Sequence, residues 1–164
     1  MEPAGLTVRL ARIEDVPQIR ASIATSLSNP TGKPQRKRLD ESIIRSELLI
    51  MERVTNGESH ILGFIEWHSR TGGQLTIRDI GTEGAEPQPT VMRRLFREML
   101  SIVAAGSGEI SLRAKSQVEP WDTVLADLPG FEVREREYSR GAWWDIWVWT
   151  GDPEFKPRND PRRR

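Results

Sequence analysis

The residues with the clearest chemical potential surround one strand-loop-helix junction within residues 74–105. A strand-like segment ends near Ile80, a loop rich in Gly, Pro and Glu follows, and apolar residues then recur at helical spacing from Val91. The first amides of such a helix point into the loop, where the aligned peptide dipoles favour an anion. The sequence therefore indicates a phosphate site at this junction, with Arg93 and Arg94 as candidate ligands.

Two features of this junction favour opposite interpretations. Arg93 and Arg94 occupy the first helical turn, where the helix dipole disfavours cations, and a bound anion would explain them. Pro87 and Pro89, however, lack N–H groups, and the glutamates of the loop repel a phosphate. A phosphate site and an ordinary surface loop before a core helix both stay open.

The acidic residues and histidines are the candidates for a general base and a metal site. Asp79 follows Ile77 and Leu75 in alternation, so it is either a general base or a capping or salt-bridging residue. Glu66 and His68 share one strand face and could relay protons, although a solvated sheet face explains them as well. Two ligands do not make a metal site, and we predict none.

The composition describes a single domain of ordinary size without a strong overall charge. The chain has 164 residues, with 24 Lys and Arg balanced by 24 Asp and Glu, and no cysteine. Because it contains no apolar run of membrane-spanning length and starts with an acidic segment, we expect a cytoplasmic protein with no membrane contact. The Pro- and Arg-rich composition from residue 151 predicts a domain over 1–150 followed by a tail over 151–164.

Periodicity predicts a mixed α/β (α+β) fold, with a largely antiparallel central sheet flanked by about four helices. The apolar stripe Ile19, Ile23 and Leu27 indicates the first helix, and Ile43, Ile44 and Glu47 indicate the second, capped by Asp40. Asn56-Gly57 and Gly72-Gly73 are typical of hairpin turns. The expected strands span 7–12, 48–54, 61–69, 74–80, 109–114, 131–138 and 142–150, and the later helices begin at Thr90 and at Pro120.

Four of the six tryptophans lie in the last predicted strand. Trp143 and Trp147 share one face with Asp145, and the opposite face is also apolar. We therefore expect both faces to be covered, one by the core and the other by a ligand groove or a partner such as a second copy of the chain.

Seven cations are concentrated in two short segments of the chain. They are Lys33, Arg36, Lys37 and Arg38 in a loop, and Arg162, Arg163 and Arg164 in the tail. These segments are either solvated or contact an acidic partner, which would be a nucleic-acid backbone or an acidic protein face.

The order of elements and two motifs resemble the GNAT superfamily of acyl-CoA-dependent N-acetyltransferases. The motifs are Leu6-Thr-Val-Arg-Leu-Ala-Arg-Ile-Glu-Asp15 at the front and Leu128-Pro-Gly-Phe-Glu132 near the end, and the likeness covers about residues 6–150. The resemblance implies acetyl-CoA as cofactor, with its pyrophosphate on a loop of the type Arg/Gln-x-x-Gly-x-Gly/Ala before the central helix. Gln88 matches that pattern, whereas Thr90 and Met92 stand where the glycines fall.

The resemblance also implies a tyrosine acid in the short helix, where this chain has Leu125 and Ala126. Two hypotheses follow. The first is an N-acetyltransferase that acts on an unidentified amine, with acetyl-CoA between the fourth and fifth strands. The resemblance then implies these cofactor-binding residues: Ile80, Gly81, Gln88, Thr90, Arg93 and Arg94. The second is a non-catalytic module that has lost CoA binding and acts through protein or nucleic-acid contacts.

Overall fold

The computed structural model describes residues 5–23, 26–28, 38–84, 87–103 and 109–151. They form a seven-stranded sheet in the order β1-β2-β3-β4-β5-β7-β6. Only β4 and β5 pair in parallel, and every other neighbouring pair of strands is antiparallel. The predicted mixed fold with a largely antiparallel sheet is confirmed.

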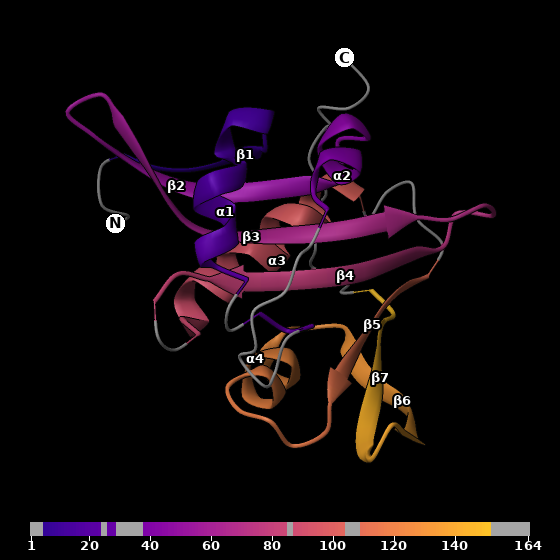
Figure 1. Ribbon diagram of the computed structural model, residues 1–164. Helices are drawn as coiled ribbons and strands as arrows, with labels where there is room; N and C mark the ends of the chain where they lie inside the picture. The colour runs from indigo at the N-terminus through magenta and orange to yellow at the C-terminus, as the bar shows by residue number, and fades with distance from the viewer. Residues whose placement is uncertain (1–4, 24–25, 29–37, 85–86, 104–108, 152–164) are drawn as a thin grey trace.

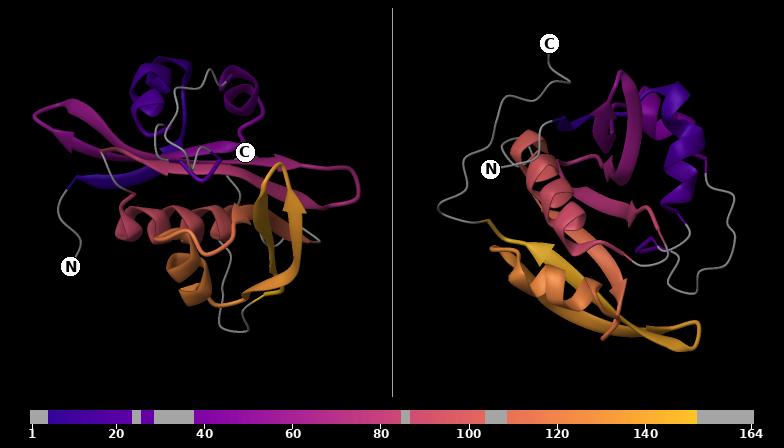
Figure 2. Two further views of the ribbon diagram at one scale, coloured as in Figure 1. Left: turned by 60° about the horizontal axis from the view of Figure 1, so that its bottom comes forward. Right: turned by 90° about the vertical axis from the view of Figure 1, so that its left-hand side faces the viewer.

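Helices cover both faces of this sheet. Figure 2 shows α1 and α2 on one face and α3 and α4 on the other. The strands are β1 Leu6–Leu10, β2 Leu48–Thr55, β3 Glu58–Ser69, β4 Leu75–Thr82, β5 Ile110–Lys115, β6 Phe131–Ser139 and β7 Ala142–Trp149 (Figure 1). The helices are the short 3-10 helix η1 Ile13–Asp15, then α1 Val16–Ala21, α2 Asp40–Ile44, α3 Pro89–Val103 and α4 Trp121–Asp127.

The predicted turns set the register of the central meander. Asn56 and Gly57 have φ angles of 52° and 79°, the left-handed pair that joins β2 to β3 in a tight hairpin. Gly72 and Gly73 make the next reversal with φ angles of 90° and 85°. The antiparallel arrangement of β2, β3 and β4 predicted from these turns is confirmed.

Three predicted boundaries were wrong, and the first matters for the candidate site. The first helix ends at Ala21, so Ile23 and Leu27 do not continue its apolar stripe although both are buried. The second helix ends at Ile44, whose side chain is 76% exposed. Gly81 lies within β4 and not in the following loop. The periodicity of apolar residues identified which side chains are buried without identifying the backbone that carries them.

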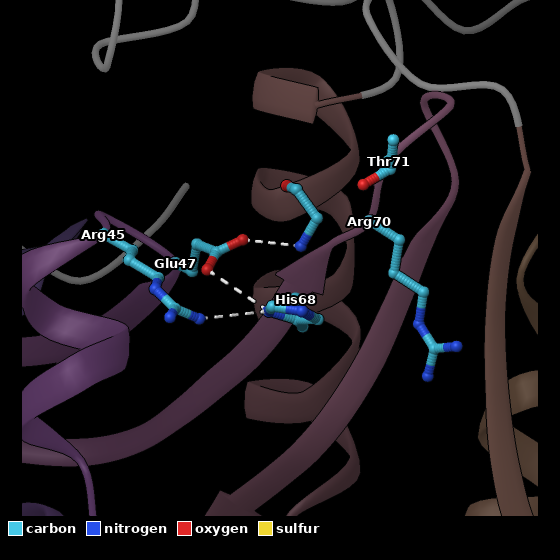
Figure 3. A pocket seen from close by; sticks show the side chains of 6 residues that line it. Arg45, Glu47, His68, Arg70 and Thr71 are labelled. Atoms are coloured by element: carbon cyan, nitrogen blue, oxygen red, sulfur yellow. Dashed lines mark hydrogen bonds and ion pairs between the residues drawn. The ribbon is translucent and has the colours of Figure 1, made fainter.

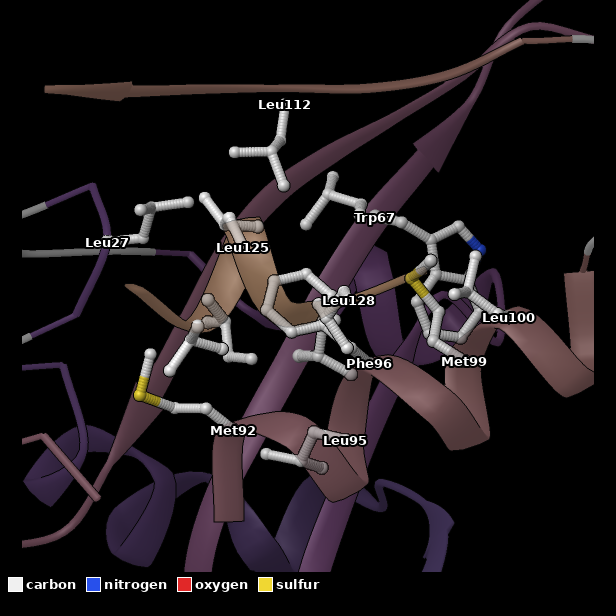
Figure 4. Close-up of a cluster of buried hydrophobic side chains, with 14 of the residues drawn as sticks. Leu27, Trp67, Met92, Leu95, Phe96, Met99, Leu100, Leu112, Leu125 and Leu128 are labelled. Atoms are coloured by element: carbon white, nitrogen blue, oxygen red, sulfur yellow. The ribbon is translucent and has the colours of Figure 1, made fainter. Parts of the chain in front are cut away.

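The main core lies between the sheet and the helices α3 and α4. From α3 it contains Met92, Leu95, Phe96 and Met99, all fully buried (Figure 4). Gly63 of β3 lets this helix approach closely, because a Cβ there would lie 2.9 Å from Val91 Cγ1. A smaller core under α1 and α2 includes Ile19, Ile50 and Phe64.

Candidate functional site

The strands β4 and β5 separate after a short parallel pairing. They are paired only at Leu75–Ile110, Thr76–Ser111 and Ile77–Leu112, yet β4 continues to Thr82 and β5 to Lys115. The register of β3 and β4 shifts here, because Glu66 pairs with Asp79 and Trp67 with Ile77, which leaves Arg78 as an extra residue. Such a bulge bends its strand. Figure 1 shows β5 running away from β4, and we call the resulting gap the splay.

The edge of β4 that faces the splay carries the backbone groups of Ile80 and Thr82. The amide of Glu83 donates to the carbonyl of Leu62 on β3, so by alternation Gly81 also faces β3 while Ile80 and Thr82 face away from it. The Ile80 amide donates to Asp79 Oδ1 at 3.0 Å, and the Ile80 carbonyl accepts the amide of Leu27 at 2.9 Å. Both splay-facing groups of Ile80 are therefore bonded within the chain.

Residues 26–28, which we call the 26–28 segment, hold Asp79 from outside the sheet. The hydroxyls of Ser26 and Ser28 donate to Asp79 Oδ2 at 3.0 and 2.7 Å, and the Ser28 amide donates to Oδ1 at 2.9 Å. With the Ile80 amide, the carboxylate accepts four hydrogen bonds, which is about its full capacity. Asp79 is completely buried. As arranged here it anchors this segment and has no capacity left to act as a base.

The Leu27 side chain occupies the splay. It is 3% exposed and belongs to the same buried cluster as Ile80 of β4, Leu112 of β5 and Leu125 of α4 (Figure 4). Since its own amide bonds to the β4 edge that faces β5, Leu27 lies between the two strands.

The end of α1 also approaches β4 closely. A Cβ at Gly81 would lie 2.1 Å from the carbonyl oxygen of Ser22, so only glycine leaves room for this contact. Ser22 Oγ is buried at the same place and has no hydrogen-bond partner in the part of the chain that the structure describes.

The N-terminus of α3 offers few donors for an anion. Its first residue, Pro89, has no N–H, and the preceding amide of Gln88 donates to Thr82 Oγ1 at 2.8 Å. The Met92 amide makes the first helical bond, to the Gln88 carbonyl. Of the four amides that a helix normally leaves unbonded, those of Thr90 and Val91 are the two that remain without a partner among the described residues. The helix begins one residue before its predicted start at Thr90.

The side chains proposed as phosphate ligands have partners within the protein. Arg93 lies 3.4 Å from Asp127 of α4, and Arg94 lies 3.1 Å from Glu98 one turn along the same helix. The Gln88 side chain donates to the carbonyl of Glu83. A phosphate would have to compete with these contacts.

A second cluster that the sequence did not indicate lies at the far end of β3 (Figure 3). Figure 3 shows Arg45 and Glu47 both directed toward His68. Their atoms lie 3.5 and 3.7 Å from its Nδ1, beside an open hollow of about 790 Å³. Glu66, which shares a strand face with His68, is buried and accepts a hydrogen bond from Ser42. The carboxylate beside the His68 ring is that of Glu47, which lies just before β2 and not on the predicted helix face.

The partner-binding candidates fall into three environments. Trp147 is 5% exposed and packs in the chain's own core, whereas Trp143 is 54% exposed and contacts Tyr138 edge to face. Within the single chain the face at Trp143 is uncovered, so its coverage by a partner stays a prediction. Arg38 is exposed and lies 3.7 Å from Asp40. The remaining candidates, Lys33, Arg36, Lys37, Arg162, Arg163 and Arg164, lie outside the described residues.

No group of three or more histidines and carboxylates among the described residues could hold a metal ion. Within the same part of the chain, no helix is long and apolar enough to cross a membrane.

No protein-family model matches the sequence, and no curated protein is significantly similar to it. Solved structures do share its fold. A GNAT-family acetyltransferase from Bacillus cereus superposes with a TM-score of 0.69 at 17% identity, covering 90% of this chain and 98% of the other. The yncA protein of Salmonella typhimurium, solved with acetyl-CoA, gives 0.67 at 15% identity and covers 93% and 98%. The ribosomal-protein-S5-alanine acetyltransferase of Vibrio fischeri gives 0.59 at 18% identity and covers 96% and 98%.

The chain therefore has the GNAT fold over nearly its whole described length. Acetyl-CoA does not fit the splay as the chain is arranged here. The Ile80 carbonyl and the Asp79 carboxylate are bonded to the 26–28 segment, and Leu27 fills the space between the strands.

Proposed function

We propose that the protein is an N-acyltransferase that takes an acyl group from acetyl-CoA and transfers it to an amine. The observation that carries this proposal is the splay itself, which a bulge at Arg78 opens between β4 and β5 in a chain with the GNAT fold. If the sheet served only to bury a core, full pairing of β4 and β5 would make the fold more stable, since unpaired backbone groups are costly when buried.

Three sets of groups would hold the cofactor. The backbone of Ile80 and Thr82 lies along the open edge of β4, with Gly81 between them. The amides of Thr90 and Val91 and the side chain of Gln88 lie at the start of α3. Arg93 and Arg94 supply positive charge on its first turns. Acyl transfer to an amine depends mainly on positioning, so the absence of a tyrosine at Leu125 or Ala126 would lower the rate without abolishing it.

Calorimetric titration with acetyl-CoA, together with a thermal-shift measurement, tests the proposal. A dissociation constant near 100 μM would stabilise the protein by about 1.4 kcal/mol at 1 mM ligand, which is a measurable shift. Radiolabelled acetyl transfer to a panel of amines, peptides with free N-termini and small amino compounds would then identify the acceptor class. Absence of binding at 1 mM in both measurements, by the wild-type protein and by variants of the 26–28 segment alike, would contradict the proposal.

A second candidate function is a non-catalytic module of the same fold. The observation that favours it is the burial of Leu27 in the splay, because a cleft converted into core no longer holds a ligand. This module would act through an acidic partner of its basic segments, through Trp143, or through both. It predicts no acetyl-CoA binding to the wild-type protein or to any variant of the 26–28 segment.

A further inference from the structure

We infer that the 26–28 segment competes with acetyl-CoA for the open edge of β4, so that the protein binds its cofactor only when this segment leaves. The inference rests on the proposed function and concerns the regulation of the same site. It starts from the disagreement between the GNAT fold, which has a splay, and the arrangement of the chain, which fills it.

A ligand and the 26–28 segment need the same backbone groups of β4. The outward edge of a sheet strand offers one N–H and one C=O at every second residue, and a ligand lying along β4 would use those of Ile80 and Thr82. The Leu27 amide already donates a hydrogen bond to the carbonyl of Ile80. A ligand and the 26–28 segment therefore cannot occupy the edge at Ile80 together.

Hydrogen bonds and apolar burial keep the 26–28 segment at this edge. Ser26 and Ser28 donate three hydrogen bonds to Asp79, which lies on β4 one residue before Ile80. Hydrogen bonds to a charged, buried acceptor are among the stronger ones in proteins. The apolar side chain of Leu27 contributes burial on the other side of the same contact. We call the arrangement in which the 26–28 segment fills the splay the closed arrangement. Asp79 acts as a positioning residue for it.

The contact between the 26–28 segment and β4 is polar as well as apolar. A segment that belonged only to the core would need burial alone, yet it brings two hydroxyls and an amide to one carboxylate. When the segment leaves, Asp79 becomes accessible beside the splay, where an amine would have to lose its proton. Closure would therefore block the cofactor and occupy the candidate base at once.

The apparent affinity for a ligand equals the intrinsic affinity multiplied by the fraction of molecules in the arrangement that can bind it. Leu27→Ala weakens only the closed arrangement, because an opened segment leaves residue 27 in solvent, and we expect it to tighten acetyl-CoA binding about tenfold or more. Asp79→Asn replaces an acceptor of four hydrogen bonds by an amide that cannot accept them all, and we expect the same direction of change.

Two matched controls separate opening of the segment from loss of stability. Leu100→Ala removes a leucine of the same core, 4% exposed, from α3. Asp145→Asn changes another buried aspartate, which lies on β7 and accepts hydrogen bonds from Ser116 and Arg136. Neither control should tighten acetyl-CoA binding. Hydrogen exchange of the 26–28 segment in the wild-type protein is the second readout, and it should become faster when acetyl-CoA is bound.

Three outcomes separate competition by the 26–28 segment from acetyl-CoA binding itself. Tighter binding by Leu27→Ala and Asp79→Asn alone, with faster exchange in the wild-type complex, supports competition. Equal binding by the wild-type protein and all four variants, with unchanged exchange, overturns the inference and leaves the proposed function intact. Absence of binding in every protein, with circular dichroism showing that each is folded, overturns the proposed function and the inference together.

Discussion

Arg9 joins two carboxylates that are far apart in the sequence. Its guanidinium contacts Asp15 at 2.7 and 3.0 Å and Glu52 at 2.9 and 3.0 Å. The hydrogen bond to Asp15, which outweighs the effect of burial, raises the pKa of Arg9 above its ordinary value. Arg9 is therefore charged at any pH at which the protein folds, and it fixes β1 to both η1 and β2.

Both carboxylates respond to this cation. Burial alone would raise the pKa of Asp15, but hydrogen bonds from Arg9 and the Arg12 amide outweigh it, and the net pKa is lowered. The hydrogen bond from Arg9 also lowers the pKa of Glu52, against a smaller effect of burial. A folded-state pKa below the unfolded value stabilises the protein above about pH 4, and this stability is lost as the pH falls further.

We predict that Arg9→Met lowers the free energy of unfolding by about 2 kcal/mol at pH 7. Breaking a buried ion pair costs roughly 3–5 kcal/mol, and the value is reduced here because the Arg9 side chain is 22% exposed. Urea unfolding measures the change, and the variant should also lose less stability between pH 5 and pH 3 than the wild type. Arg134→Met, which breaks the exposed pair with Glu109, should cost under about 1 kcal/mol. Equal costs for both would contradict the assignment.

Arg93 and Arg94 test the phosphate end of the proposed site. We predict that changing both to alanine weakens acetyl-CoA binding by about tenfold or more, because two charged contacts would be lost. Arg97→Ala is the control, since Arg97 lies exposed on the same helix and is not a candidate ligand. Unchanged affinity in calorimetry would remove both arginines from the site.

Single residues were the least predictable level of the site. Sequence reasoning singled out Asp79 as a carboxylate on the right strand, but the hydroxyls that hold it come from residues 51 and 53 positions away. Serines in an unpatterned stretch carry no local signal of such a contact. Glu47 beside His68 was missed for the same reason, because only the turn after α2 brings the two together.

At the scale of elements, the contact between α1 and β4 depends on one glycine. We predict that Gly81→Ala lowers the free energy of unfolding by about 1–3 kcal/mol, since its Cβ would lie 2.1 Å from the Ser22 carbonyl and backbone must move. Thermal or urea unfolding checks this value. Gly57→Ala provides the comparison, because a Cβ there meets nothing within 4 Å and only the left-handed φ of 79° opposes it. A loss at Gly81 no larger than that at Gly57 would rule out the close contact.

Elements were predicted well where periodicity and turn chemistry agreed. The strands of the meander and α3 appear within a few residues of their expected bounds, because apolar alternation and left-handed turn residues specify the same arrangement. The stretch after Ala21 shows the reverse. Ile23 and Leu27 have helical spacing, but the Leu27 amide bonds to β4, and the two side chains belong to different core clusters. A stripe of apolar residues cannot distinguish a helix from a segment that inserts one leucine into a sheet.

At the scale of the whole molecule, the exposed aromatic contact on β6 and β7 is the site proposed for a second copy of the chain. Trp143, 54% exposed, and Tyr138, 63% exposed, lie near the tip of the outer hairpin. We predict that sedimentation finds a dimer that Trp143→Ser shifts to monomer without lowering the melting temperature. Trp147→Ser should instead destabilise the fold, because that residue is buried. A wild-type monomer at 100 μM would contradict the proposal.

The distribution of charge gives the last prediction. The seven cations at 33–38 and 162–164 leave 17 cations against 24 carboxylates elsewhere, so a chain of zero net charge is strongly polarised. Contacts between such basic segments and an acidic partner weaken steeply with salt, because they depend on screened charges and released counterions. We predict association with a fluorescent polyanion, single-stranded oligonucleotide or polyglutamate, that weakens at least tenfold as salt rises from about 50 to 200 mM and is lost when the chain ends at Gly151. Fluorescence anisotropy measures both effects, and a full-length protein with Arg162, Arg163 and Arg164 changed to glutamine separates charge from length. If truncated and full-length proteins bind equally at low salt, the tail has no binding role, and this result favours the acyltransferase over the partner-binding module.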